Sequence, residues 1–187
     1  MYSIIELWLP ILLSAVIVFI ASSVMHMVLT YHRKDFSRLP NEDRVADALR
    51  DAPPGQYMFP WSSSMKEMAT PPMVEKFKRG PIGMLTLRRP GMPTMGPFLV
   101  QWFIFSLFVA IFVAYVCSRT LMAGVDYLGV FRIAGVVAFL GFAGPEATRS
   151  IWGGQPWGVT IRNYIDGLIY ALLVAGVFGW LWPWRTP

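Results

Sequence analysis

The sequence predicts an all-α membrane protein with four transmembrane helices and, between helices one and two, a partly ordered cytoplasmic cap of short helices and short strands. The composition points this way, because 55% of the 187 residues are hydrophobic and only 14% are charged, whereas soluble domains are roughly 25% charged. Four long apolar segments and an uneven distribution of lysine and arginine point the same way. A chain of this length suits one domain, so residues 1–187 are expected to form a single integral membrane domain.

Each apolar segment is close to the roughly 20 residues that an α-helix needs to cross a bilayer. The first segment lacks a basic leading region and runs directly into HRKDF, so it is interpreted as a retained helix and not as a cleaved signal peptide. The third and fourth segments are shorter and carry Arg132 and Asp166. The expected helices cover residues 4–29, 97–117, 127–144 and 164–182.

Lysine and arginine concentrate on alternate connections between these segments. Eleven of the sixteen lie in residues 31–95 and two more in residues 148–163, whereas only Arg119 and Arg185 flank the helices at the other end. Basic residues near helix ends tend to stay on the cytoplasmic side. We therefore expect a multi-pass protein of the bacterial inner membrane, with the 31–95 cap in the cytoplasm and both termini in the periplasm.

The cap carries its own secondary-structure signals. LPNEDRVADALRD predicts a short amphipathic helix with Asn41 at its N-cap. PPMVEKFKRG predicts a second short helix that ends at Gly80, and GMLTL is expected to pair as a strand with QYMF. Aromatic and methionine side chains are too frequent here for a disordered loop, so the cap is predicted to be ordered in part.

Seven of the eleven methionines lie in the cap, including the pairs Met65–Met68 and Met92–Met95. Thioether clusters bind Cu(I), but methionine is also a flexible filler at partner-facing surfaces. Because no cysteine lies nearby, the second interpretation is favoured. A metal-handling membrane protein that uses the Met-rich cap is retained as an alternative.

No catalytic, cofactor-binding or metal-binding residue is predicted, and the protein is not expected to be an enzyme. His26 and His32 are the two histidines of the chain, and they lie six residues apart at the end of the first segment. A bis-His haem needs imidazoles that face one site, normally from different helices. The pair is therefore interpreted as hydrogen-bonded residues at the membrane surface. The single cysteine, Cys117, excludes an internal disulfide framework.

Charged residues close to the membrane faces are interpreted as ion-pair partners. Arg132 would extend to the surface or pair with Glu6 or Asp126, and Asp166 would cap the start of the fourth helix together with Asn163. Four of these residues fall near the inner face and are expected to form one network. The candidates are Arg132 and, at the inner face, Glu146, Arg149, Arg162 and Asp166.

Small residues recur at every fourth position on two of the predicted helices. Such a face allows the backbones of membrane helices to approach closely. The second and fourth helices are therefore expected to pack tightly, either with each other or with a partner subunit. The residues are Ser106, Ala110, Ala114 and Ser118 on the second helix, and Gly167, Ala171, Ala175 and Gly179 on the fourth.

The stretch SIWGGQPWG between the third and fourth helices favours a hinge at the membrane surface over a ligand-binding loop. Its glycines permit a sharp turn, and it contains no charged or nucleophilic side chain except the hydroxyl of Ser150. Tryptophan is enriched at the level of the lipid headgroups. The predicted interfacial anchors are Trp152, Trp157, Trp180, Trp182 and Trp184.

Several motifs, among them PPGQYMFP, KRGPIGMLTL and SIWGGQPWG followed by DGLIYALLVAGVFGWLWP, resemble a family of uncharacterised small four-helix bacterial integral membrane proteins. The resemblance covers nearly the whole chain. It implies four membrane helices with a large loop after the first, and it implies no activity.

We expect a non-catalytic structural or accessory subunit of a larger bacterial membrane complex, of respiratory or photosynthetic type, or a homo-oligomer. Its partners would be the lipid bilayer and other membrane protein subunits or copies of itself. No cofactor is expected, and no nucleic acid, because the chain lacks a basic stripe or a nucleic-acid-binding motif. A small transporter or channel component is the alternative, although it would need polar side chains along a path at mid-membrane.

Overall fold

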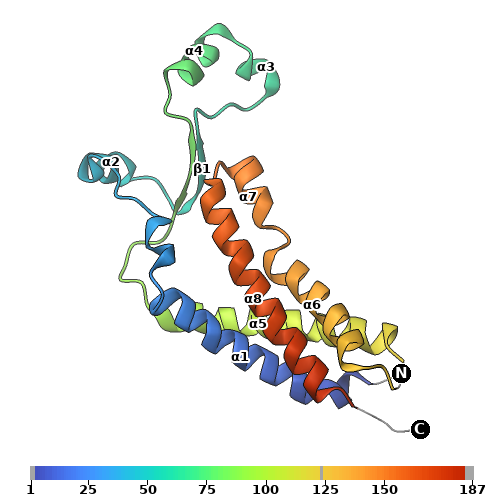
Figure 1. The fold of residues 1–187 in the computed structure, drawn as a ribbon. Helices are drawn as coiled ribbons and strands as arrows, with labels where there is room; N and C mark the ends of the chain where they lie inside the picture. The colour runs from blue at the N-terminus through green and yellow to red at the C-terminus, as the bar shows by residue number, and fades with distance from the viewer. Residues whose placement is uncertain (1–2, 123, 184–187) are drawn as a thin grey trace. The chain divides into compact units, whose positions relative to one another are not determined.

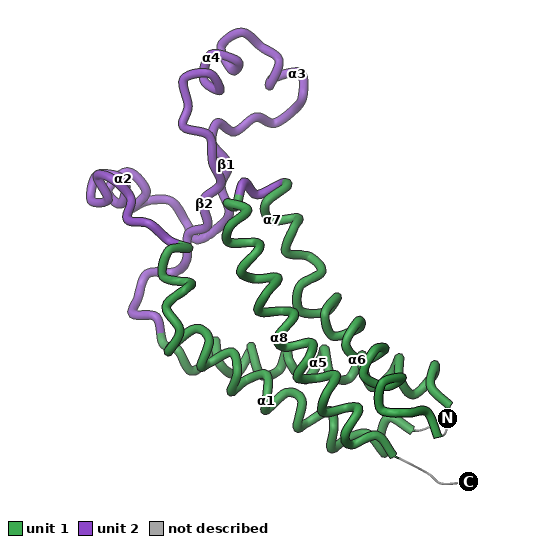
Figure 2. Tube along the Cα trace, viewed as in Figure 1, with its two compact units in different colours: residues 1–35, 94–151, 155–187 green, residues 36–93, 152–154 purple. Residues whose placement is uncertain are grey.

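The computed structural model describes residues 3–122 and 124–183. The chain divides into two compact units (Figure 2). The helical unit comprises Met1–Asp35, Thr94–Ile151 and Gln155–Pro187, and the hairpin unit comprises Phe36–Pro93 and Trp152–Gly154.

Four long helices form the helical unit (Figure 1). Each is long and apolar enough to cross a membrane, so the predicted fold class is confirmed and the chain is a multi-pass membrane protein with four candidate spans. The first span joins the 3-10 turn η1 to α1, and the third runs from α6 into α7. The elements are η1 (Ile4–Leu7), α1 (Trp8–Met27), α5 (Met95–Thr120), α6 (Tyr127–Ala143), α7 (Glu146–Gly153) and α8 (Trp157–Leu181).

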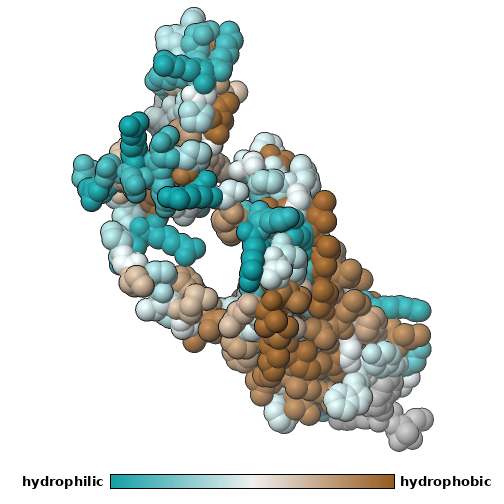
Figure 3. Space-filling model, turned by 60° about the vertical axis from the view of Figure 1, so that its left-hand side comes forward, coloured by the Kyte–Doolittle hydropathy of each residue, from teal (hydrophilic) through white to brown (hydrophobic). Residues whose placement is uncertain are grey.

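The four spans pack as a ring in the order α1, α5, α6 and α8, so that α5 and α8 lie on a diagonal. Side chains such as Val18, Val113, Ala138 and Val174 fill the interior of this ring. Large apolar side chains cover the outer faces of the long helices (Figure 3). Apolar side chains on the outside as well as the inside are expected where the surroundings are lipid and not water.

Both small-residue faces are buried inside the helical unit. On α8 they meet α6, because a Cβ built on Gly167 would contact Ala143, and one built on Gly179 would contact the ring of Tyr127. One alternative was that the small-residue faces of α5 and α8 pack against each other. They do not, because α5 and α8 lie on a diagonal of the ring. The other alternative, packing against a partner subunit, stays a prediction. Small residues at these positions let α6 and α8 approach closely.

The hairpin unit contains three short helices and a two-stranded antiparallel sheet. The predicted pairing of GMLTL with QYMF is confirmed, with Tyr57 opposite Leu85. Asn41 occupies the N-cap position of α2, but its left-handed backbone (φ 56°) keeps the side chain from making a capping hydrogen bond. The elements are α2 (Glu42–Leu49), β1 (Gly55–Phe59), α3 (Met65–Met68), α4 (Pro71–Arg79) and β2 (Gly83–Leu87).

Candidate functional site

A buried carboxylate, Asp166, is the centre of a polar cluster within the helical unit. It lies on α8, and its side chain is only 6% exposed. The hydroxyl of Tyr31 donates to Asp166 Oδ1, and Nε2 of His32 lies 2.8 Å from Oδ2. Both partners belong to η2 (Tyr31–Lys34), a 3-10 turn that follows α1. The chain therefore turns back after the first span and places its side chains against the last one.

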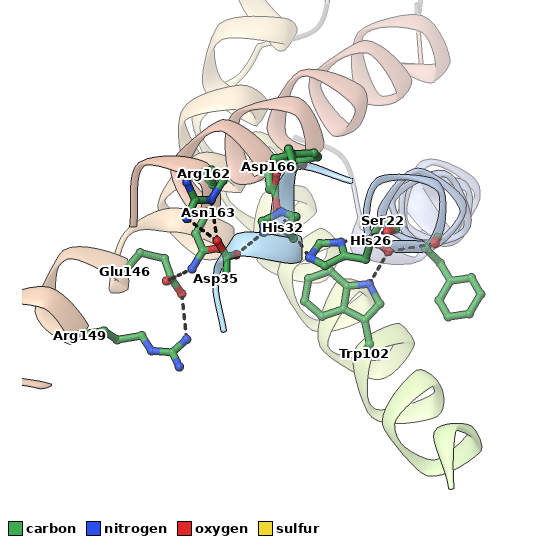
Figure 4. Close-up of polar contacts among 12 residues, drawn as sticks. Ser22, His26, His32, Asp35, Trp102, Glu146, Arg149, Arg162, Asn163 and Asp166 are labelled. Carbon is green, nitrogen blue, oxygen red and sulfur yellow. Dashed lines mark hydrogen bonds and ion pairs between the residues drawn. The ribbon is translucent and has the colours of Figure 1, made fainter. Parts of the chain in front are cut away.

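A second buried carboxylate, Asp35, lies on the other side of the His32 ring (Figure 4). Nδ1 of His32 is 2.6 Å from Asp35 Oδ2, and Nε of Arg162 donates to Oδ1 at 2.6 Å. Burial alone would raise the pKa of Asp35, but the hydrogen bonds from His32 and Arg162 outweigh it and hold this pKa below its usual range. Asp35 is therefore ionised at neutral pH, and His32 lies between two carboxyl groups.

The ring of His26 stacks on that of His32, with centroids 4.5 Å apart and an interplanar angle of 10°. Nδ1 of His26 lies 3.0 Å from the carbonyl oxygen of Ser22. Because a carbonyl oxygen only accepts, this nitrogen carries the proton. The other nitrogen, Nε2, then points toward Asp166 Oδ2 at 3.7 Å. One ring nitrogen of each histidine and an oxygen of Asp166 lie within 4.8 Å of one another, so these residues form a set that could hold a metal ion.

The hydroxyl of Tyr31 completes the surroundings of Asp166. Burial, followed by the hydrogen bond to Asp166, raises the pKa of Tyr31 above its ordinary value. The phenol therefore keeps its proton at any physiological pH and acts as a donor to the carboxylate. One oxygen of Asp166 is thus occupied by Tyr31, while the other faces the two histidines.

The four charged residues predicted at the inner face fall into two groups and not one network. Arg162 joins Asp35 and Asp166 joins His32, as described above. Separately, Glu146 accepts from Asn163 Nδ2 at 2.7 Å and pairs with Arg149 at 3.8 Å (Figure 4). Asp166 was expected to cap a helix start, but α8 begins at Trp157, so Asp166 lies in the third turn of the helix.

Arg132 makes neither of the ion pairs considered for it. Its side chain is exposed on α6, and within residues 3–122 and 124–183 no ion pair joins it to Glu6 or Asp126. Asp126 instead caps α6 by accepting from the amide of Gly129 at 2.9 Å. The remaining interpretation, an arginine that extends to the membrane surface, stays a prediction.

The predicted tryptophan anchors differ in their exposure. Trp152, Trp157 and Trp180 are exposed, and their position at the lipid headgroups stays a prediction. Trp182 is only 1% exposed and packs within the interior of the helical unit, which differs from the surface position expected. Trp184 lies outside the described residues. In SIWGGQPWG, the expected sharp turn is present, because Gly154 has a positive φ of 70° between α7 and α8.

Sequence reasoning missed the pairing of His32 with Asp166 and the contributions of Tyr31 and Asp35. These residues are more than 100 positions away from α8 in sequence, and no short motif joins them. The signal that could have found this pairing was the topology. The end of the first helix and the start of the fourth were predicted at the same membrane face, and they carry His32 and Asp166.

No protein family, no curated protein and no solved structure matches this chain. The fold and the site together define the class: a small multi-pass membrane protein with four candidate spans and a buried histidine–carboxylate cluster. The resemblance described from the motifs stays an expectation.

Proposed function

We propose that this protein is a non-catalytic accessory subunit of a larger bacterial membrane complex, and that its hairpin unit docks onto another subunit. The observation that carries the proposal is a groove on the sheet of the hairpin unit, in which the apolar side chains of Met58, Trp61 and Met84 line part of the wall. All three side chains are exposed, and Trp61 is 66% exposed. Methionine and tryptophan with this exposure are typical of surfaces that another protein covers.

The sheet register explains how the groove arises. Met58 and Met84 are directly opposite each other in the antiparallel pair, so their side chains share one face. Within the part of the chain that the structure describes, the sheet has two strands, so each strand has one edge without a neighbouring strand. An open edge beside an apolar face suits a partner that adds an extended segment or a helix. The charge distribution of the chain favours the cytoplasmic side for this unit.

The test is gentle-detergent purification of the tagged protein from native membranes, followed by mass spectrometry of the intact particle. The double variant Met58→Thr, Met84→Thr removes the apolar pair while keeping a residue that favours strands. The matched control is Met65→Ser, which changes an exposed methionine of α3 in the same unit. We expect defined partner subunits with the wild type and the control, and their loss in the double variant.

Two results would contradict the proposal. One is a wild-type protein that purifies without any other membrane subunit. The other is a double variant that keeps the same partners in the same amounts, with circular dichroism showing that it is folded. If the wild-type particle contains only copies of this chain, the proposed partner is another copy of the chain and not a different subunit.

A further inference from the structure

We propose that His26, His32 and Asp166 bind a divalent transition metal ion, of which Zn²⁺ is the representative probe. Two imidazoles and a carboxylate form a ligand set that zinc and related metals accept. This inference concerns the helical unit alone and does not depend on the docking role of the hairpin unit.

The distances between the donor atoms suit a metal ion, whereas the ring orientations require one imidazole to turn. Nε2 of His32 and Nε2 of His26 lie 2.8 Å and 3.7 Å from Asp166 Oδ2. Tetrahedral coordination with bonds of about 2.0–2.1 Å places neighbouring ligand atoms about 3.3 Å apart. The two observed distances bracket this value. Because the rings of His26 and His32 are stacked nearly parallel, with an interplanar angle of 10°, one ring must also turn so that both lone pairs point at the same ion.

The hydrogen bonds around the three side chains orient them as metal ligands. A ligating histidine usually donates its other N–H to a carboxylate or a backbone carbonyl. Nδ1 of His26 faces the carbonyl of Ser22, and Nδ1 of His32 faces Asp35. The remaining nitrogen of each ring therefore points at Asp166.

Partners hold the carboxylates of this arrangement as well. Arg162 holds Asp35, the carboxylate that accepts from His32. Tyr31 donates to the oxygen of Asp166 that faces away from the two rings. Each of the three ligands consequently has an outer hydrogen-bond partner, which a set of side chains gathered only by chance would rarely show.

A cation resolves an electrostatic conflict in the cluster. In its neutral form, His26 with the proton on Nδ1 directs the lone pair of Nε2 at a carboxylate oxygen, which is unfavourable. One metal ion placed between the three atoms would relieve this conflict. The metal uses all three groups as ligands at once, and leaves a coordination position for water because the protein supplies three ligands.

The proposed site is most open on the side of His26. The side chain of His26 is 51% exposed, whereas those of His32 and Asp166 are 14% and 6% exposed. His26 therefore forms the open side of the site, and the other two ligands form its buried base.

The experiment uses the full-length protein in detergent, with the affinity tag removed and metals stripped by chelation. Zn²⁺ is titrated against a chromophoric competitor, and Co²⁺ replaces it to report coordination through its visible d–d bands. We expect one ion per wild-type chain and four-coordinate Co²⁺ bands. His26→Ala should abolish this site while remaining folded, because His26 is half-exposed. Asp35→Asn should weaken binding about 10–100-fold.

The matched control is Glu146→Gln, which removes a neighbouring carboxylate outside the proposed ligand set and should bind Zn²⁺ as the wild type does. The proposal is overturned if the wild type binds no Zn²⁺, or if folded His26→Ala binds it with unchanged stoichiometry and affinity. In either case, the cluster is a hydrogen-bonded ion-pair network that fastens the end of α1 to α8. Neither result bears on the docking role, because no partner subunit takes part in this assay.

Discussion

Replacing Gly167 with alanine should loosen the packing of α6 against α8. A Cβ at this position would lie 2.6 Å from Cβ of Ala143 and 3.3 Å from its Cα and its amide nitrogen. Carbon atoms pack at about 3.5–4.0 Å, so the two helices must separate locally by roughly 1 Å. The obstacle is partly backbone, and a change of rotamer cannot remove it.

The size of the effect follows from two opposing contributions. Overfilling a well-packed interior costs about 1–3 kcal/mol, whereas alanine in place of glycine within a helix gains about 0.5–1 kcal/mol. We therefore expect a net loss of about 1 kcal/mol, and at most about 2.5 kcal/mol, in the free energy of unfolding for Gly167→Ala. The gain from alanine is smaller than the cost because the added methyl group would fall inside the radius of its neighbour.

Unfolding in mixed micelles with increasing SDS, followed by circular dichroism, measures this difference. Gly176→Ala is the control on the same helix, because its added Cβ would have the hydroxyl oxygen of Tyr127 as its nearest neighbour at 3.9 Å. That variant should be as stable as the wild type or slightly more stable. Combining Gly167→Ala with Ala143→Gly should recover part of the loss. If Gly167→Ala proves no less stable than the control, the close approach of the two helices is refuted.

Three further predictions use other contacts. Arg162→Met leaves Asp35 buried without its guanidinium and should cost about 1–3 kcal/mol in the same unfolding assay; an unchanged midpoint would contradict it. Trp102→Phe removes the indole hydrogen bond to Ser22 Oγ, 2.8 Å long, and should cost about 1 kcal/mol, which equal midpoints would disprove. The pKa of Glu67 should lie below its ordinary value in an NMR titration, because the hydroxyl and the backbone amide of Ser63 both donate to its carboxylate. A pKa at or above the ordinary value would count against those two hydrogen bonds.

The features that depend on patterns within one continuous segment could be predicted from the sequence. The number of spans, the antiparallel strand pair and the helix that ends at Gly80 all depend on local patterns, and all three are present. The start of α8 could not be predicted in this way. An apolar pattern stops at Arg162 and Asn163, whereas backbone hydrogen bonding continues back to Trp157. Polar residues in the first turns of a helix do not interrupt it, because they can face partners outside the lipid.

That shift of α8 decides where Asp166 lies, and with it the nature of the site. A carboxylate in the first turn of a helix is satisfied by the amides of that turn, and it needs no distant partner. A buried carboxylate in the third turn finds those amides already engaged, so it must be paired from another segment. Among the described residues, the hydrogen-bond partners of its side chain come from the turn after α1, where Tyr31 and His32 both reach it. The helix boundary, which hydropathy defines least well, is therefore the feature on which the pairing of the first and last spans depends.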